Sequence, residues 1–214
     1  VSEVLLSLPK NIFSGKKITS AVKGILPGEN VLLNDFLQKE FCVKIENYFA
    51  VLGPCHAEEV ASEKLSYLTF TGIDEKITSD IASFFKTEYL NTVCNKDIYG
   101  VQYAAVLKNI YAVGAGIAHG LDYGDNFLSV LIANSADEMA GFLRKAGIIN
   151  AEVGYNADET NISAVHHANY AASVYLGDLL VTCYSLFSRN RTFGNMVGKC
   201  YSVKNAQMAM RMVA

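Results

Sequence analysis

The first 95 or so residues alternate short β-rich runs with segments that carry apolar residues at helical spacing. Runs rich in β-branched and aromatic residues predict strands, and the periodic segments behind them predict helices. Strands that alternate with helices of this length indicate βαβ units and a sheet that is at least partly parallel. The predicted strands are residues 17–22, 48–52 and 67–71, and the predicted helices are residues 29–41, 56–64 and 74–85.

The pattern changes after Asp97. Residues 98–120 form one long apolar stretch with many alanines and glycines, which predicts a core helix that neighbours can approach closely. Further helices are predicted over residues 126–143, 164–183 and 203–213, and no further strand is predicted. The chain is therefore expected to hold the end of an α/β domain, then an all-α domain, with the boundary at residues 93–98. The polar stretch 147–164 predicts a surface loop or insertion.

Composition narrows the class of protein. Hydrophobic residues make up 51% of the 214 positions, which excludes a disordered chain. With 18 Lys and Arg against 21 Asp and Glu, the net charge of −3 argues against nucleic acid or an anionic membrane as partner. Lys108 and Asn109 interrupt the longest apolar stretch, so it is not expected to span a membrane. Five cysteines without metal-ligand spacing favour a reducing compartment, and no metal site is predicted.

Two predicted strand ends carry groups that suit an anionic or polar ligand. Lys23 and Gly24 follow the first strand, and Gly53, Cys55 and His56 follow the second. In open α/β sheets, ligands bind outside the carboxyl ends of the strands, and the N–H groups that begin a helix attract anions. A solvated turn lysine and an ordinary helix start are the alternatives at these two places.

Lys108 lies among apolar residues of the long helix. Burial of an ammonium group is costly, and a second cation nearby such as Lys23 would lower the Lys108 pKa further, toward the range of a general base. The alternative is a lysine at the polar edge of the helix.

A lone Asp178 in an apolar helix precedes the sequence Ser188, Arg189, Asn190 and Arg191. A hydroxyl, two guanidinium groups and an amide in four residues match the oxygens of a phosphate group. A basic surface loop is the alternative.

Taken in order, these segments resemble the NAD(P)-dependent glycerol-3-phosphate dehydrogenases of the bacterial type. The resemblance covers nearly the whole chain. The amino-acid sequence of residues 175–178 and 198–204 is similar to that of family members from the Bacteroidetes. The segments that carry it are residues 53–60, 108–112, 120–126, 177–183 and 188–194.

The resemblance implies the second half of a Rossmann-type nucleotide-binding domain over residues 1–96, without its first βαβ unit. A helical substrate-binding and catalytic domain, incomplete at its C-terminus, would follow over residues 97–214. It also implies a cytoplasmic oxidoreductase that reduces dihydroxyacetone phosphate to sn-glycerol 3-phosphate with NADH or NADPH, for glycerophospholipid synthesis. A homodimer is left open.

Carried over position by position, the resemblance makes Lys108 the catalytic residue, which exchanges a proton with the C2 oxygen of the substrate. The residues implied to contact substrate are Lys23, Gly53, Cys55, Lys108, Asp178, Ser188, Arg189 and Asn190. The residues implied to contact the cofactor are Lys23, Ala57, Arg189 and Val213.

Two departures from the family matter. The dinucleotide fingerprint G-x-G-x-x-G does not occur in the sequence, and Cys55 stands where the family has serine. We therefore expect a chain truncated at both ends that is inactive alone. One alternative is a non-catalytic module that binds a phosphorylated ligand or mediates oligomerisation. Another is a two-domain dehydrogenase for a hydroxy acid, whose substrate would not require the Ser188 to Asn190 cluster.

Overall fold

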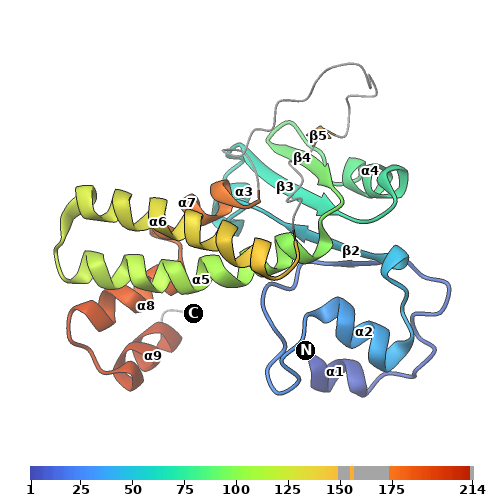
Figure 1. The fold of residues 1–214 in the computed structure, drawn as a ribbon, viewed down its shortest axis with the longest axis horizontal. Coiled ribbons are helices and arrows are strands. Elements are labelled where there is room, and N and C mark those ends of the chain that lie inside the picture. Colours follow the sequence, from blue (N-terminus) through green and yellow to red (C-terminus); the bar gives the residue numbers. More distant parts are fainter. Residues whose placement is uncertain (149–154, 157–173, 213–214) are drawn as a thin grey trace.

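The computed structural model describes residues 1–148, 155–156 and 174–212, and within them a mixed sheet leads into an all-helical half (Figure 1). The strands follow one another across the sheet in chain order. Neighbours β1 and β2 are parallel, as are β3 and β4, whereas β2–β3 and β4–β5 are antiparallel. The expected partly parallel sheet is confirmed. The strands are β1 (Ile18–Ser20), β2 (Tyr48–Leu52), β3 (Ser66–Thr71), β4 (Leu90–Asn95) and β5 (Tyr155–Asn156).

Several helices begin at a residue whose side chain caps the free backbone N–H groups. Asp74 accepts a hydrogen bond from the Ile77 amide at the start of α4, and Ser188 accepts one from the Arg191 amide at the start of α8. The helices are α1 (Ser2–Leu6), α2 (Leu33–Phe41), the 3₁₀ turn η1 (Ile45–Asn47), α3 (Ala57–Ala61), α4 (Glu75–Ser83), α5 (Ile98–Gly120), α6 (Gly124–Lys145), α7 (Leu176–Tyr184), α8 (Arg189–Gly198) and α9 (Val203–Met212).

The two faces of the sheet bury different side chains, because successive residues of a strand point to opposite sides. On β2, Tyr48, Ala50 and Leu52 join the main core, which includes residues of α2, α5, α6 and α7. Val51 points the other way, into a smaller cluster with residues of β3, β4 and α4. The main core is therefore continuous from the sheet into the helical half, and α5 is the element that links them.

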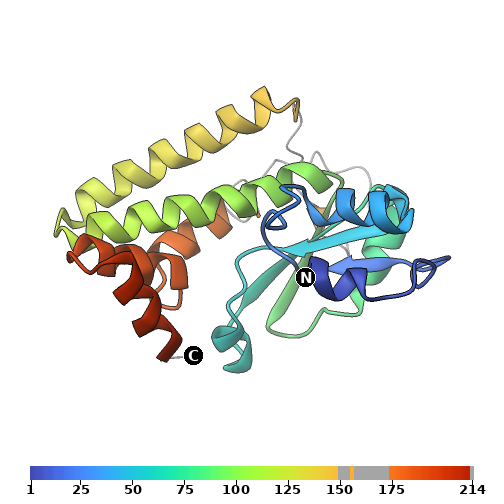
Figure 2. The same ribbon diagram turned by 90° about the horizontal axis from the view of Figure 1, so that it is seen from below.

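Helix α5 runs through the helical half with α6 on one side and α8 on the other (Figures 1 and 2). Its contact with α8 is close because glycines face it from both helices. A Cβ on Gly116 would collide with the Arg191 carbonyl, and a Cβ on Gly194 would collide with the Val113 carbonyl. The backbones approach so closely that neither position has room for a methyl group. This contact brings α8 alongside the C-terminal part of α5.

Three expectations from the sequence were wrong. Strand β4 was not predicted, because its polar residues hide the apolar pattern; it pairs with β3 and β5. The expectation of no strand after Asp97 fails at β5. Residues 188–194, interpreted as a turn or basic loop, form the cap and the first part of α8, whose glycines pack against α5. The predicted insertion lies mostly outside the described residues, as do Val213 and the first part of the helix predicted over 164–183.

The glycine contact yields a prediction about stability. We expect Gly194→Ala to lower the free energy of unfolding by about 1–3 kcal/mol, since the new methyl group must push the α5 backbone away. Gly114→Ala on α5 is the matched control, because a Cβ there meets no atom within 4 Å. It should raise stability by roughly 0.5–1 kcal/mol through its helix propensity. Urea unfolding of both variants measures the difference, and equal effects would contradict the close contact.

Candidate active site

Lys108, Asp178 and Thr182 form a buried polar cluster between α5 and α7. The Lys108 Nζ atom lies 2.5 Å from Oδ1 of Asp178 and donates a hydrogen bond of 3.2 Å to the Thr182 hydroxyl. Lys108 is only 4% exposed and Asp178 only 2%. Burial of two charges is tolerated when they are paired at short range and hydrogen-bonded, as they are here. Lys108 is thus a core lysine with a counter-ion, and the alternative of a lysine at the polar edge of the helix is wrong.

The spacing along α7 explains the arrangement. Asp178 and Thr182 are four residues apart, so they share one face of the helix, and that face lies against α5. The Thr182 hydroxyl donates a hydrogen bond of 2.5 Å to the backbone carbonyl of Asp178. Its oxygen is thereby oriented to accept the bond from Lys108. Thr182 was not among the predicted site residues, although its spacing from Asp178 was a usable signal.

The carboxyl ends of β1 and β2 bring a second cation to the cluster. The Lys23 Nζ atom lies 3.7 Å from Oδ2 of Asp178 and donates a hydrogen bond of 3.4 Å to the Gly53 carbonyl. The Asp178 carboxylate therefore lies between two ammonium groups. Gly53 has a φ of 130°, and a Cβ there would lie 2.9 Å from the Tyr67 carbonyl, so this turn requires glycine.

Burial and charge together set the protonation of the site. Burial, reinforced by the nearby Lys23, lowers the pKa of Lys108 to about 8, while Asp178 opposes the shift. Burial also raises the pKa of the Cys55 thiol, and the Lys23 charge offsets part of that effect. Lys108 can consequently give up and regain a proton near neutral pH, whereas Cys55 stays a neutral thiol. Oδ2 of Asp178 has no hydrogen-bond partner among the described residues.

The predicted phosphate-binding residues lie at the start of α8. Ser188 is buried as the cap, Asn190 is half-buried and Arg189 is exposed. Within the described part of the chain, no hydrogen bond or ion pair joins these three to Lys108 or Asp178. The structure thus brings Lys23, Gly53, Lys108 and Asp178 into one cluster and leaves Ser188, Arg189 and Asn190 at a neighbouring helix start.

Arg191 was named in the motif but not among the predicted site residues. Its side chain is 8% exposed, and its Nε atom has no hydrogen-bond partner among the described residues. Its charge lowers the pKa of Cys183 on α7, although burial is stronger and leaves that pKa raised, at about 11. The sequence holds no signal that separates this buried arginine from its exposed neighbour Arg189, because their burial depends on how α8 packs.

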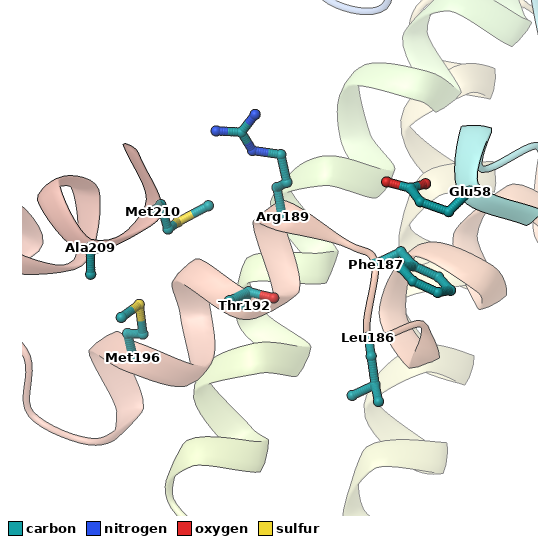
Figure 3. Close-up of a pocket in the computed structure, with 8 residues that line it drawn as sticks. All are labelled: Glu58, Leu186, Phe187, Arg189, Thr192, Met196, Ala209 and Met210. Atoms are coloured by element: carbon teal, nitrogen blue, oxygen red, sulfur yellow. The ribbon is translucent and has the colours of Figure 1, made fainter. Parts of the chain in front are cut away.

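A cavity of about 480 Å³ opens beside Arg189 (Figure 3). Its wall is largely apolar, and Glu58 of α3 lies across from Arg189 of α8. Ala57 begins α3 and precedes Glu58, so the predicted cofactor contacts Ala57 and Arg189 lie at or next to this cavity. The lining residues are Glu58, Leu186, Phe187, Arg189, Thr192, Met196, Ala209 and Met210.

The cavity fits part of a nicotinamide dinucleotide. Apolar side chains such as Phe187 and Met210 suit a flat ring, and the exposed Arg189 guanidinium suits a phosphate. The His56 ring packs against Phe187 with 6.2 Å between ring centres, which joins the start of α3 to the segment before α8. The predicted contact Val213 lies outside the described residues.

The described residues contain neither a metal-binding cluster nor a membrane-spanning helix. No group of three or more His, Cys, Asp or Glu side chains is placed to hold a metal ion. No helix in the described ranges is long and apolar enough to cross a membrane. The five cysteines are free.

The lowered pKa of Lys108 makes stability depend on pH. Between about pH 8 and 10.5, the unfolded chain binds a proton at Lys108 that the folded chain has lost, so this residue adds stability as pH rises. We expect the wild type to gain unfolding free energy relative to Lys108→Met across this window. Tyr48 and Tyr111, whose pKa values burial raises to about 12, are common to both proteins. Urea unfolding at several pH values gives the difference, and a constant difference would contradict the assignment.

Comparison with known proteins identifies the family. The family model for the NAD-dependent glycerol-3-phosphate dehydrogenase N-terminus matches residues 1–78, and the model for the C-terminus of the same family matches residues 97–214. The glycerol-3-phosphate dehydrogenase (NAD(P)+) of Bacillus cytotoxicus is 32% identical over 212 residues, as is that of Bacillus anthracis strain A0248. The alignment covers 99% of this chain and 57% of each relative, so the chain spans little more than half their length.

Solved structures agree with the sequence comparison. A glycerol-3-phosphate dehydrogenase from Coxiella burnetii superposes with a TM-score of 0.75 at 26% identity, covering 91% of this chain and 54% of that one. One from Saccharomyces cerevisiae, at 20% identity, shares the fold with a TM-score of 0.72 over 97% of this chain and 56% of that one. The Rossmann-like sheet and the helical half are the two parts that these structures share with the chain. The chain belongs to the NAD-dependent glycerol-3-phosphate dehydrogenase family.

Proposed function

We propose that this chain carries the catalytic lysine of an oxidoreductase that reduces dihydroxyacetone phosphate to sn-glycerol 3-phosphate with NADH or NADPH. The observation that carries the proposal is the buried Lys108–Asp178 pair, in which the lysine pKa falls to about 8. A protein that only binds a phosphorylated ligand has no need of a buried lysine with a near-neutral pKa. This feature favours an enzyme over a non-catalytic binding module.

In the proposed reaction, Lys108 donates a proton to the C2 oxygen as the carbonyl carbon is reduced. The nicotinamide, when bound, supplies the hydride to that carbon. An ammonium group with a pKa of about 8 is mostly protonated at neutral pH and releases its proton readily to a forming alkoxide. Asp178 keeps the Lys108 chain in place, and Lys23 adds positive charge on the same side of the site.

Substrate and cofactor contacts are proposed from the same geometry. Ser188, Arg189 and Asn190 at the start of α8 would bind the substrate phosphate, and Gly53 and Cys55 in the turn after β2 would contact the substrate beside Lys23. Lys23, Ala57, Arg189 and Val213 are proposed to contact the cofactor. The exposed Arg189 and the apolar cavity beside it support the cofactor assignment for the residues that line it.

The domain division is also a proposal. We assign residues 1–96 to part of the nucleotide-binding domain and residues 97–214 to the helical domain, because the chain leaves β4 at Asn95 and enters α5 at Ile98. A cytoplasmic location, a homodimer, a role in glycerophospholipid synthesis and an origin in the Bacteroidetes follow only from the resemblance and stay predictions.

Turnover tests the catalytic assignment. We expect Lys108→Ala to lower kcat for reduction of dihydroxyacetone phosphate by about 10²–10⁴, the usual contribution of a general acid. The decrease in absorbance of the reduced nicotinamide measures the rate. The assay uses the whole protein that the gene encodes, and the coding DNA before Val1 and after Ala214 defines that protein. A cooperative unfolding transition and an unchanged far-UV circular dichroism spectrum show that the fold is intact, and near-normal turnover would exclude the role.

The same absorbance assay, with inorganic phosphate added as an inhibitor, distinguishes a triose phosphate from a hydroxy acid as substrate. Inorganic phosphate should compete with a phosphorylated substrate, because it would occupy the site at Arg189 and Asn190. We expect Arg189→Ala to raise KM at least tenfold and to weaken the competition. Turnover of a phosphate-free hydroxy acid, with no inhibition by phosphate, would favour the other class of dehydrogenase.

A further inference from the structure

A hydrogen bond between two helix starts lies next to the Lys108 site. Tyr175 immediately precedes α7, and Asp97 immediately precedes α5. The Tyr175 hydroxyl donates to Oδ2 of Asp97, while Oδ1 of the same carboxylate accepts a 2.8 Å bond from the Gly100 amide. One carboxylate therefore caps α5 and holds the start of α7, although the two residues are 78 positions apart.

This hydrogen bond between Tyr175 and Asp97, called the bridge below, is largely shielded from solvent. Tyr175 is only 7% exposed and belongs to the main core, and Asp97 is half-buried. A Cβ on Gly100 would overlap the Asp97 carboxylate, so the carboxylate occupies the space where a side chain would otherwise stand. A hydrogen bond to a charged, partly buried carboxylate is stronger than a bond between neutral groups. The bridge is thus a firm attachment between α5 and α7.

The bridge and the buried polar cluster of Lys108, Asp178 and Thr182 connect the same two helices. Tyr175 precedes Asp178 by three residues and Thr182 by seven, which places all three on one face of α7. On α5, Lys108 follows Asp97 by eleven residues, about 16 Å along the axis. The two helices are therefore held together at their starts and again at the Lys108 level.

We infer that Tyr175 is a positioning residue, whose bond to Asp97 fixes α7 along α5 and so holds Asp178 and Thr182 against the Lys108 ammonium. The inference rests on the proposed function in that Lys108 is the group whose proton is transferred. Two attachments at different heights stop α7 from sliding or rotating, whereas the Lys108 contacts alone would leave the flexible lysine chain to follow any movement of α7.

Movement of α7 would change the charges around Lys108 unequally. Asp178 and Cys183 are on α7 itself, whereas Lys23 follows β1 and Arg191 is on α8. Asp178 is the nearest of these groups and raises the pKa of Lys108, against the lowering effects of burial and Lys23. A small shift of α7 would lengthen the 2.5 Å contact with Asp178 and leave Lys108 buried, so loss of the bridge should lower the Lys108 pKa.

A carbon NMR titration of the Lys108 side chain tests this without requiring turnover. We expect Tyr175→Phe to lower the titration midpoint by about half a pH unit, which is about a threefold change in the ratio of neutral to charged lysine. Tyr99→Phe is the matched control, because Tyr99 on α5 also donates to an aspartate, Asp35, at 2.9 Å. That variant should leave the midpoint in place, since its bond links α5 to α2.

Asp97→Asn provides a second, independent route to the same change. Its amide keeps an oxygen to cap Gly100 but removes the charged acceptor of Tyr175. If the bridge is the cause, the double variant should shift the midpoint no further than either single variant. A midpoint that is unchanged or raised in Tyr175→Phe, or additive shifts in the double variant, would overturn the inference. A shifted midpoint in a protein without dehydrogenase activity would instead exclude the proposed function and leave the bridge standing.

Discussion

The placement of one ammonium group in the core is the constraint on which the rest of this structure depends. Lys108 is almost fully buried, and removal of its charge from water is unfavourable unless a carboxylate and a hydroxyl replace the lost hydration. Asp178 and Thr182 supply both from a single face of α7. Two helices must therefore be held at a fixed separation and register, or the charge has no partner.

The surrounding fold supplies that fixed geometry from several directions. Helix α5 passes from the sheet into the helical half and carries Lys108 at its middle. On one side, Gly116 and Gly194 allow α8 to approach so closely that its capped start lies beside α5. At the sheet, the ends of β1 and β2 direct Lys23 and the Gly53 turn to the same cluster. Groups from both halves of the chain thus meet around one carboxylate.

Electrostatics divides the titratable groups of the site into two kinds. Lys108 is brought near neutral pH, because burial and Lys23 outweigh Asp178, and it is the group suited to exchange protons. The thiols of Cys55 and Cys183 move the other way, since burial disfavours the thiolate, and both remain neutral. Cys55 thus contributes a small, uncharged group, and the ammonium groups of Lys23 and Lys108 remain the cations of the site.

Strong local patterns were enough to predict β2, α5 and the polar residues that later proved central, since a lysine or an aspartate within an apolar helix is conspicuous in sequence. Strand β4 and helix α8 escaped prediction, because their polar residues become buried only when neighbouring elements satisfy them. The sequence by itself determined the alternation of strands and helices before residue 97 and the long helices after it, and it singled out Lys108 and Asp178. Only the tertiary structure decided that these two form a pair with Thr182, 74 positions from Lys108, because such contacts depend on helix packing rather than on spacing along the chain.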